Sequence, residues 1–113
     1  MRKLTLVLAL LSCSNALAMF FGGIGIKIRQ DPGPQFVISE VFANGPAEQA
    51  GVFVGEEIKG VDGSTVSRKT LQEVANMIQG AAGSDVALAL RHASYPNLRV
   101  VKVKRVELPP ANL

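Results

Sequence analysis

The sequence is poor in the residues that build metal and redox sites. Its 113 residues include one cysteine (Cys13), one histidine (His92) and no tryptophan. A structural zinc site usually takes about four Cys or His ligands, and a disulfide needs a pair of cysteines. One Cys and one His also cannot provide a supported Cys–His catalytic pair. We therefore expect neither a metal site nor a cofactor.

A strong charge of one sign is also missing. Lys and Arg number 12 against 9 Asp and Glu, so the formal net charge at pH 7 is +3. Two of the basic residues, Arg2 and Lys3, lie at the extreme N-terminus, and their removal would lower the charge to +1. Nucleic-acid binding depends on a strong positive field, so we expect no nucleic-acid partner.

What the chain does have is apolar residues, which make up 48% of it. That fraction supports a compact core and is too high for a disordered protein. A chain of this length forms one small domain. The composition therefore predicts a single folded unit.

The first 18 residues have the pattern of a secretory signal peptide. A basic start is followed by an apolar run that ends at Leu11, and residues 16–18 (Ala-Leu-Ala) provide a small-residue cleavage site. The run is too short to span a bilayer as a helix; an uncleaved anchor or a buried N-terminal helix is the alternative. We expect a signal peptide at 1–18, a folded domain at 19–108 and a short tail at 109–113.

Cys13 leaves a second route to the cell envelope open. Residues 10–13 (Leu-Leu-Ser-Cys) resemble a bacterial lipobox, in which the cysteine becomes the lipidated first residue. Leu11 is bulkier than that motif usually allows, so soluble export is our main interpretation. Contact with a membrane is expected only if Cys13 is lipidated.

Hydrophobic periodicity predicts an α+β domain of about five strands, with one short and one longer helix. Strands are expected at residues 24–29, 35–41, 57–61, 85–91 and 98–108, with turns at 62–63 and 94–97. Pro46 and Gly51 bound the short helix. The longer helix lies within residues 66–79 and carries an apolar stripe at three- and four-residue steps.

The ends of the longer helix are predicted from capping residues. Thr70 and Glu73 fit a capping box, Ser67 is an alternative cap, and Gly80 supplies a stop. Lys69, beside these caps, is interpreted as a solvated lysine.

Glycine motifs along the chain resemble the PDZ family. Gly23-Ile24-Gly25-Ile26 resembles its carboxylate-binding loop, and residues 44–52 resemble its short helix. Residues 54–58 resemble its Gly-Asp-x-Ile step, with Glu56 where Asp is usual, and residues 61–66 resemble its Val-Asn/Asp-Gly turn. The resemblance covers residues 21–108. Because the domain starts at the carboxylate loop and ends with an extra strand, it is similar to the circularly permuted PDZ domain of bacterial C-terminal processing (tail-specific) proteases.

This resemblance implies a small PDZ-like fold, a partly open β-barrel or sandwich, that binds peptides without catalysis. The similar proteases carry a separate Ser-Lys catalytic domain that we do not find in this sequence, so we expect no enzyme. The implied role is a peptide-binding adaptor or scaffold, exported to the periplasm or lipid-anchored through Cys13. The alternative is an envelope or secretion-system assembly component that docks a fixed partner without reading a free carboxylate.

The resemblance also implies where a peptide binds. The carboxylate loop comprises Gly23, Ile24, Gly25 and Ile26, with the N–H groups of residues 24–26 as donors. The remaining groove residues are Lys27, Ile28, Ser39, Leu71, Ala75 and Ile78. Leu71 and Ala75 favour a protein or peptide with an apolar C-terminus, although Leu71, Ala75 and Ile78 could instead be plain core. Phe20 and Phe21 could cover the groove, and the oligomeric state is left open.

Basic residues gather near the predicted C-terminal strands. They are Arg91, Arg99, Lys102, Lys104 and Arg105. The main interpretation is a solvated strand face that resists aggregation. Contact with anionic headgroups is the alternative if the protein is lipid-anchored.

Overall fold

The computed structural model describes residues 23–30 and 33–107. The expected signal peptide, Cys13, Phe20, Phe21 and residues 109–113 lie outside the described residues.

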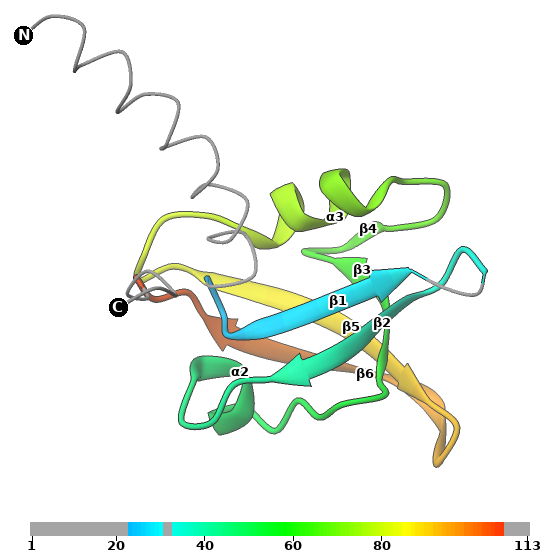
Figure 1. Ribbon diagram of the computed structural model, residues 1–113, viewed down its shortest axis with the longest axis horizontal. Helices are drawn as coiled ribbons and strands as arrows, with labels where there is room; N and C mark the ends of the chain where they lie inside the picture. Colours follow the sequence, from blue (N-terminus) through cyan, green and yellow to red (C-terminus); the bar gives the residue numbers. More distant parts are fainter. Residues whose placement is uncertain (1–22, 31–32, 108–113) are drawn as a thin grey trace, which may run out of the picture.

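An antiparallel sheet of six strands dominates the described part of the chain (Figure 1). The strands are β1 (Ile26–Gln30), β2 (Phe36–Val41), β3 (Glu57–Val61), β4 (Ser64–Thr65), β5 (Asp85–His92) and β6 (Tyr95–Lys104). Their order is β1-β2-β3-β5-β6, with β4 paired to β3. Within the described sheet, β1, β6 and the short β4 each pair with one neighbour and are therefore edge strands.

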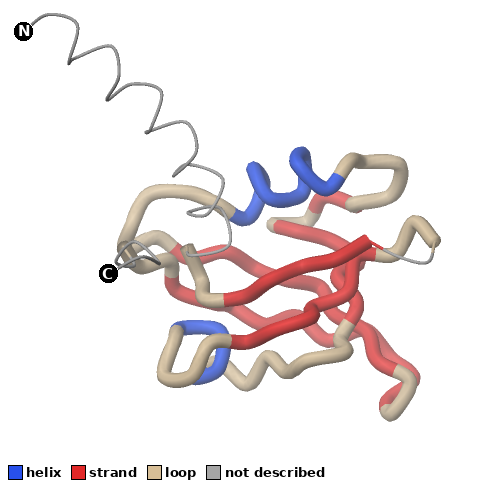
Figure 2. Tube along the Cα trace, in the orientation of Figure 1, coloured by secondary structure: helices blue, strands red, loops and turns tan. Residues whose placement is uncertain are grey.

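Two helices flank the sheet. They are α2 (Pro46–Gln49) and α3 (Leu71–Ile78), and Figure 2 shows them on opposite sides of the strands. α3 lies beside β1 and β3, whereas α2 lies beside β6. In the described part, neither helix has the length and apolar character needed to cross a membrane. This arrangement is the predicted α+β, PDZ-like fold.

The core follows from the alternation of apolar residues. Ile26 and Ile28 of β1 point inward while Lys27 and Arg29 point outward. Val86, Leu88 and Leu90 alternate in the same way along β5, as the period of a strand requires.

The longer helix is shorter than its predicted range, and its start is set by the predicted capping box. Thr70 Oγ1 accepts a hydrogen bond from the Glu73 amide (3.0 Å), and Glu73 Oε1 accepts one from the Thr70 amide (2.8 Å). Ser67 does not cap this helix; its amide donates to Thr65 Oγ1. The helix therefore begins at Leu71 rather than at Val66.

Gly80 follows the helix for a reason other than the predicted one. The C-cap is Gln79, in an extended conformation with φ −69° and ψ 148°. A Cβ on Gly80 would lie 2.6 Å from Arg105 Cζ. Glycine is therefore needed here for space, not for a left-handed helix end.

The last strand begins and ends earlier than predicted. β6 starts at Tyr95, which pairs with His92, so residues 94–97 do not form the predicted turn. After Lys104 the backbone turns to other partners: Arg105 donates to Ser84 O (2.7 Å) and Val106 to Gly23 O (2.9 Å). These bonds end the strand well before Leu108.

Candidate functional site

The segment at residues 23–25 is fixed by its carbonyl groups. The carbonyl oxygens of Gly23, Ile24 and Gly25 each accept a backbone hydrogen bond of 2.9 Å. The donors are Val106 after β6, Ala47 in α2 and Phe42 after β2. Three separate parts of the domain therefore hold this loop in place.

The same bonds set the direction of the next three amides. In a trans peptide unit the C=O and the following N–H point in opposite directions. Because the carbonyls of residues 23–25 point toward their donors, the N–H groups of Ile24, Gly25 and Ile26 point the other way. Gly25 has φ +81°, a conformation that favours glycine. Three successive N–H groups at the start of β1 thus point away from the partners of the loop, and in this structure residues 24–26 are buried.

β1 continues from this loop as an edge strand. In the described sheet it pairs with β2 alone, and its other side faces α3 (Figure 1). The pair Lys27 and Glu40 is 3.5 Å apart on the outer surface, where ion pairs contribute little stability. An unpaired strand edge can accept an extended peptide as one more strand.

The wall opposite β1 is α3, whose apolar residues form two rows. Val74 and Ile78 belong to the hydrophobic core, and Leu71 packs against it while staying half-buried. Ala75 is buried but is not part of the core cluster. Leu71 and Ala75, one turn apart, therefore lie along a row beside the core row.

The structure places the predicted groove residues in the loop before β1, in β1 itself, in a bulge of β2 and in α3. Lys27 is exposed, and so is Ser39. Ser39 is the extra residue of a bulge between the pairs Lys27–Glu40 and Ile28–Ile38. Most of the apolar groove residues are almost fully buried: Ile24, Ile26, Ile28, Ala75 and Ile78. In this structure those side chains are covered, so entry of a ligand side chain requires a local rearrangement.

Arg105 holds the C-terminal end of α3. Its guanidinium donates to Ile78 O (2.7 Å) and Met77 O (3.4 Å), and also to Ser84 Oγ (2.9 Å) and Asp85 O (3.1 Å). A cation at a helix C-terminus is also favoured by the helix dipole. Because Val106 bonds to Gly23 O, residues 105–106 tie both the loop and the helix to β6.

A second buried network fixes the segment before β3. Glu56 is fully buried, and its carboxylate accepts two hydrogen bonds from Arg99, at 2.9 and 3.1 Å. The Tyr95 hydroxyl and the Phe53 amide also donate to it. Burial alone would raise the pKa of Glu56, but these hydrogen bonds outweigh it and the pKa is lowered from 4.5.

Both networks correct the sequence-based interpretation of the basic cluster. Arg105 is only 8% exposed and so does not belong to a solvated face, and Arg99, although partly exposed, is held by the buried Glu56. The signals in the sequence were slight. Arg105 lies two residues after Val103 and four after Val101, which places it on the same face of a strand as these valines. Glu56 stands where the Gly-Asp-x-Ile step of the PDZ family usually has Asp.

Comparison with known proteins identifies the family. The family model of the PDZ domain matches residues 37–92. The chain is 32% identical over 93 residues to carboxyl-terminal-processing peptidase 2, chloroplastic, from Arabidopsis thaliana, which covers 78% of this chain and 18% of that protein. It is 29% identical over 96 residues to the carboxy-terminal processing protease CtpB of Bacillus subtilis, in a match that covers 85% of this chain and 20% of that protein. The chain thus spans about a fifth of the length of these relatives.

Solved structures agree with these relatives. The photosystem II D1 C-terminal processing protease has a TM-score of 0.70 and 33% identity, over 78% of this chain and 24% of that chain. The PDZ domain of the carboxy-terminal protease from Vibrio cholerae was solved in complex with a peptide. Its TM-score is 0.67 and its identity 27%, over 77% of this chain and 95% of that chain. The matched region is a noncatalytic module in relatives that are proteases. The described residues therefore form a PDZ domain of the type found in C-terminal processing proteases.

Proposed function

We propose that this protein binds extended peptides with free apolar C-termini in the groove between β1 and α3, as a noncatalytic adaptor or scaffold. One observation carries the proposal. The carbonyls of residues 23–25 are all bonded to other parts of the domain, so the N–H groups of residues 24–26 point away from those partners, at the start of a strand whose other edge is unpaired in the described sheet.

The loop, β1 and α3 would each contact a different part of the peptide. The N–H groups of residues 24–26 donate to the peptide carboxylate, and β1 pairs with the peptide as an added antiparallel strand. The last ligand side chain enters between the loop and Ala75 once the buried groove residues move apart. Leu71 faces the side chain two residues before the end and favours an apolar one there.

The similar domain from Vibrio cholerae was solved with a peptide, which supports the peptide as ligand class. For the cellular setting we propose export to the periplasm after cleavage at Ala18. Lipid anchoring through Cys13 is the alternative.

A second candidate function rests on the burial of the groove. Ile24, Ile26 and Ile78 are covered in this structure, as they would be in a domain that does not admit a ligand side chain. Such a domain would be an assembly component that docks a fixed partner by another face.

A peptide screen tests the proposal. Fluorescent decapeptides carry Ala, Val, Leu, Ile or Phe at the last and third-last positions, each as a free acid and as an amide. We expect micromolar binding of some free acids and loss of that binding on amidation. Leu71→Glu should weaken it at least about tenfold, because a charge would enter an apolar groove.

The matched control is Gln72→Glu, which adds the same charge at the exposed neighbouring position on α3. This variant should bind like the unmodified protein. If no free acid binds while the protein is folded by circular dichroism, the domain does not read C-termini. The assembly function would then be the better account.

A further inference from the structure

A pocket of about 830 Å³ lies where β1 and β2 approach the loop that precedes α3. Its charged lining is mostly basic: Arg29, Lys59, Arg68 and Arg91, against the single acid Glu57. None of these residues belongs to the groove described above, so the pocket has no role in the proposed carboxylate site.

Strand register explains how these charges meet. Arg29 pairs with Val37, Val37 with Glu57, and Glu57 with Arg91, so the four form one row across β1, β2, β3 and β5. The adjoining residues on these four strands, Ile28, Phe36, Ile58 and Leu90, are buried in the core. Because successive residues point to opposite faces, the charged row lies on the outer face.

Among the described lining residues, Glu57 is the one acid beside four basic side chains. Glu57 lies 3.4 Å from Lys59 and is engaged there. Arg29 also takes part in an interaction. Arg68 and Arg91 are exposed, and within the part of the chain that the structure describes they form no ion pair. Two guanidinium groups therefore remain available to an incoming anion.

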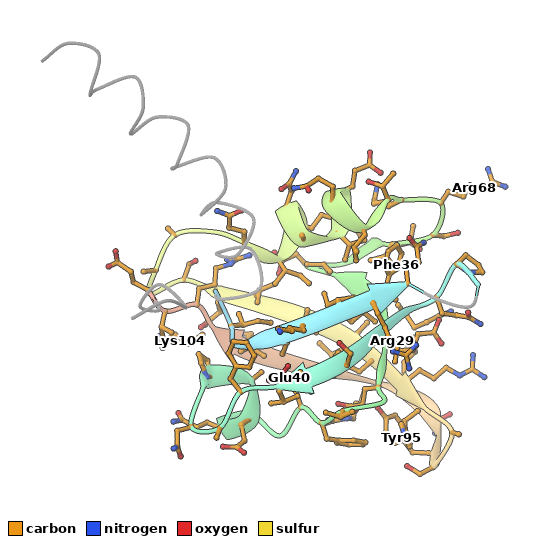
Figure 3. The ribbon with its side chains drawn as sticks, viewed as in Figure 1. Arg29, Phe36, Glu40, Arg68, Tyr95 and Lys104 are labelled. Carbon is orange, nitrogen blue, oxygen red and sulfur yellow. The ribbon has the colours of Figure 1, made fainter. Side chains whose placement is uncertain are left out.

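Arg68 has an unusual backbone as well. Its φ is +67°, in the left-handed region where Gly and Asn are the usual residues. Figure 3 shows its side chain projecting from the loop before α3, at the same end of the molecule as Arg29. A long basic side chain is thus presented at the edge of the pocket.

The pocket lies on the path of a bound peptide. A peptide antiparallel to β1 has its C-terminus at the 23–26 loop and runs upstream toward Gln30. At about 3.4 Å per residue, the residue about four positions before its end reaches the end of β1. Earlier residues leave the groove beside Arg29 and Arg68, both of which line the pocket.

We propose that this basic pocket is a second subsite, which binds acidic side chains about four to seven residues upstream of the ligand's C-terminus. Carboxylates pair with guanidinium groups through two parallel hydrogen bonds. This inference rests on the proposed function, because the groove sets the register of the peptide. The preferred ligand is thus an apolar C-terminus preceded by an acidic segment.

Matched peptides test the subsite. Decapeptides carry the tightest-binding apolar tail from the screen above, preceded by four Glu, four Gln or four Lys residues, and are titrated by fluorescence anisotropy. At low salt the Glu peptide should bind about fivefold more tightly than the Gln peptide, as a few surface ion pairs would give. The Lys peptide should bind more weakly than both. About 0.5 M salt should remove these differences.

Variants assign the effect to the pocket. The double variant Arg68→Gln/Arg91→Gln should lower the affinity for the Glu peptide to that for the Gln peptide, while the affinity for the Gln peptide stays unchanged. Arg68→Glu should shift the preference toward the Lys peptide. The control Lys104→Gln removes a basic residue that does not line the pocket, and it should keep the preference for the Glu peptide.

Equal affinities for the Glu and Gln peptides, with binding still lost on amidation, would overturn the subsite and leave the C-terminus reader intact. A Glu preference that survives the double variant would also overturn it. If no peptide of the screen binds, the groove and the subsite both fall.

Discussion

Glu56 brings a carboxylate into the interior, where Arg99, Tyr95 and the Phe53 amide satisfy it. Arg99 also donates to Gly51 O (2.7 Å) and lies over the rings of Phe53 and Tyr95. These contacts join the segment before β3 to the hairpin of β5 and β6. The Glu56 carboxylate is fully buried while the Arg99 side chain is 35% exposed, so the cost of removing the carboxylate comes from the hydrogen bonds lost at its buried end.

We therefore expect Glu56→Gln to lower the free energy of unfolding by about 3 kcal/mol at pH 7. Urea denaturation followed by circular dichroism measures this. The control is Glu57→Gln, which removes the same charge from a half-buried residue paired with a partly exposed lysine. Its cost should stay under about 1 kcal/mol. Equal costs for both variants would contradict a special role for Glu56.

The same residue predicts a dependence on pH. The pKa of Glu56 is lower in the folded protein than the ordinary value of 4.5. Its stabilising contribution is therefore complete above about pH 4.5 and is lost as the pH falls through the folded-state pKa. The difference in unfolding free energy between the protein and Glu56→Gln should thus shrink on acidification below pH 4.5.

At the scale of elements, α3 depends on its cap because it has only eight residues. Helices this short are unstable alone and need tertiary packing and satisfied ends. Thr70→Ala removes the side-chain acceptor for the Glu73 amide and should cost about 1 kcal/mol. Thermal unfolding measures the loss, and hydrogen exchange should show faster opening of the first turn of α3.

Ser67→Ala is the control for this cap. Ser67 lies outside the helix, and the bond that it makes to Thr65 uses its backbone amide, which the substitution keeps. The cost should be under about 0.5 kcal/mol. A larger loss for Ser67→Ala than for Thr70→Ala would mean that the helix starts earlier than Leu71.

Elements were predictable where local pattern decides them. The bounds of β3 match its predicted range, and the capping box marks the start of α3. The sequence did not predict β4, because two exposed residues show no alternation of apolar and polar side chains. They form a strand only through pairing with β3. The prediction of a turn at 94–97 was wrong. Tyr95 is the first residue of β6 instead, and its hydroxyl donates a hydrogen bond to Glu56, 39 residues away in sequence.

The candidate site was predictable to the same degree. The Gly-Ile-Gly-Ile motif located the loop, but not the donors that fix its carbonyls. Those donors come from Phe42, Ala47 and Val106, in three separate parts of the domain. Arg105 likewise reaches Ile78 O across 27 residues of sequence. Partners so distant are set by the fold, and no local spacing encodes them.

At the scale of the whole molecule, Arg105 connects α3 with Ser84 and Asp85 at the start of β5. Arg105→Met keeps most of the side-chain volume but removes the guanidinium that donates to Met77 O, Ile78 O and Asp85 O. We expect it to lower the free energy of unfolding by about 3 kcal/mol. Lys104→Met, at the adjacent exposed position 3.9 Å from Asp85, should cost under about 0.5 kcal/mol. Urea denaturation compares the two variants. Similar midpoints would show that Arg105 is not needed to hold α3.

The bond between Val106 N and Gly23 O joins the first and last parts of the described domain at a single point. A module whose two ends meet can be inserted between two adjoining residues of a host domain without forcing the host apart. Its entry and exit segments would leave side by side, next to residues 23–25. If the proposed groove binds a peptide, such an insertion would place the mouth of the groove at the junction with the host domain.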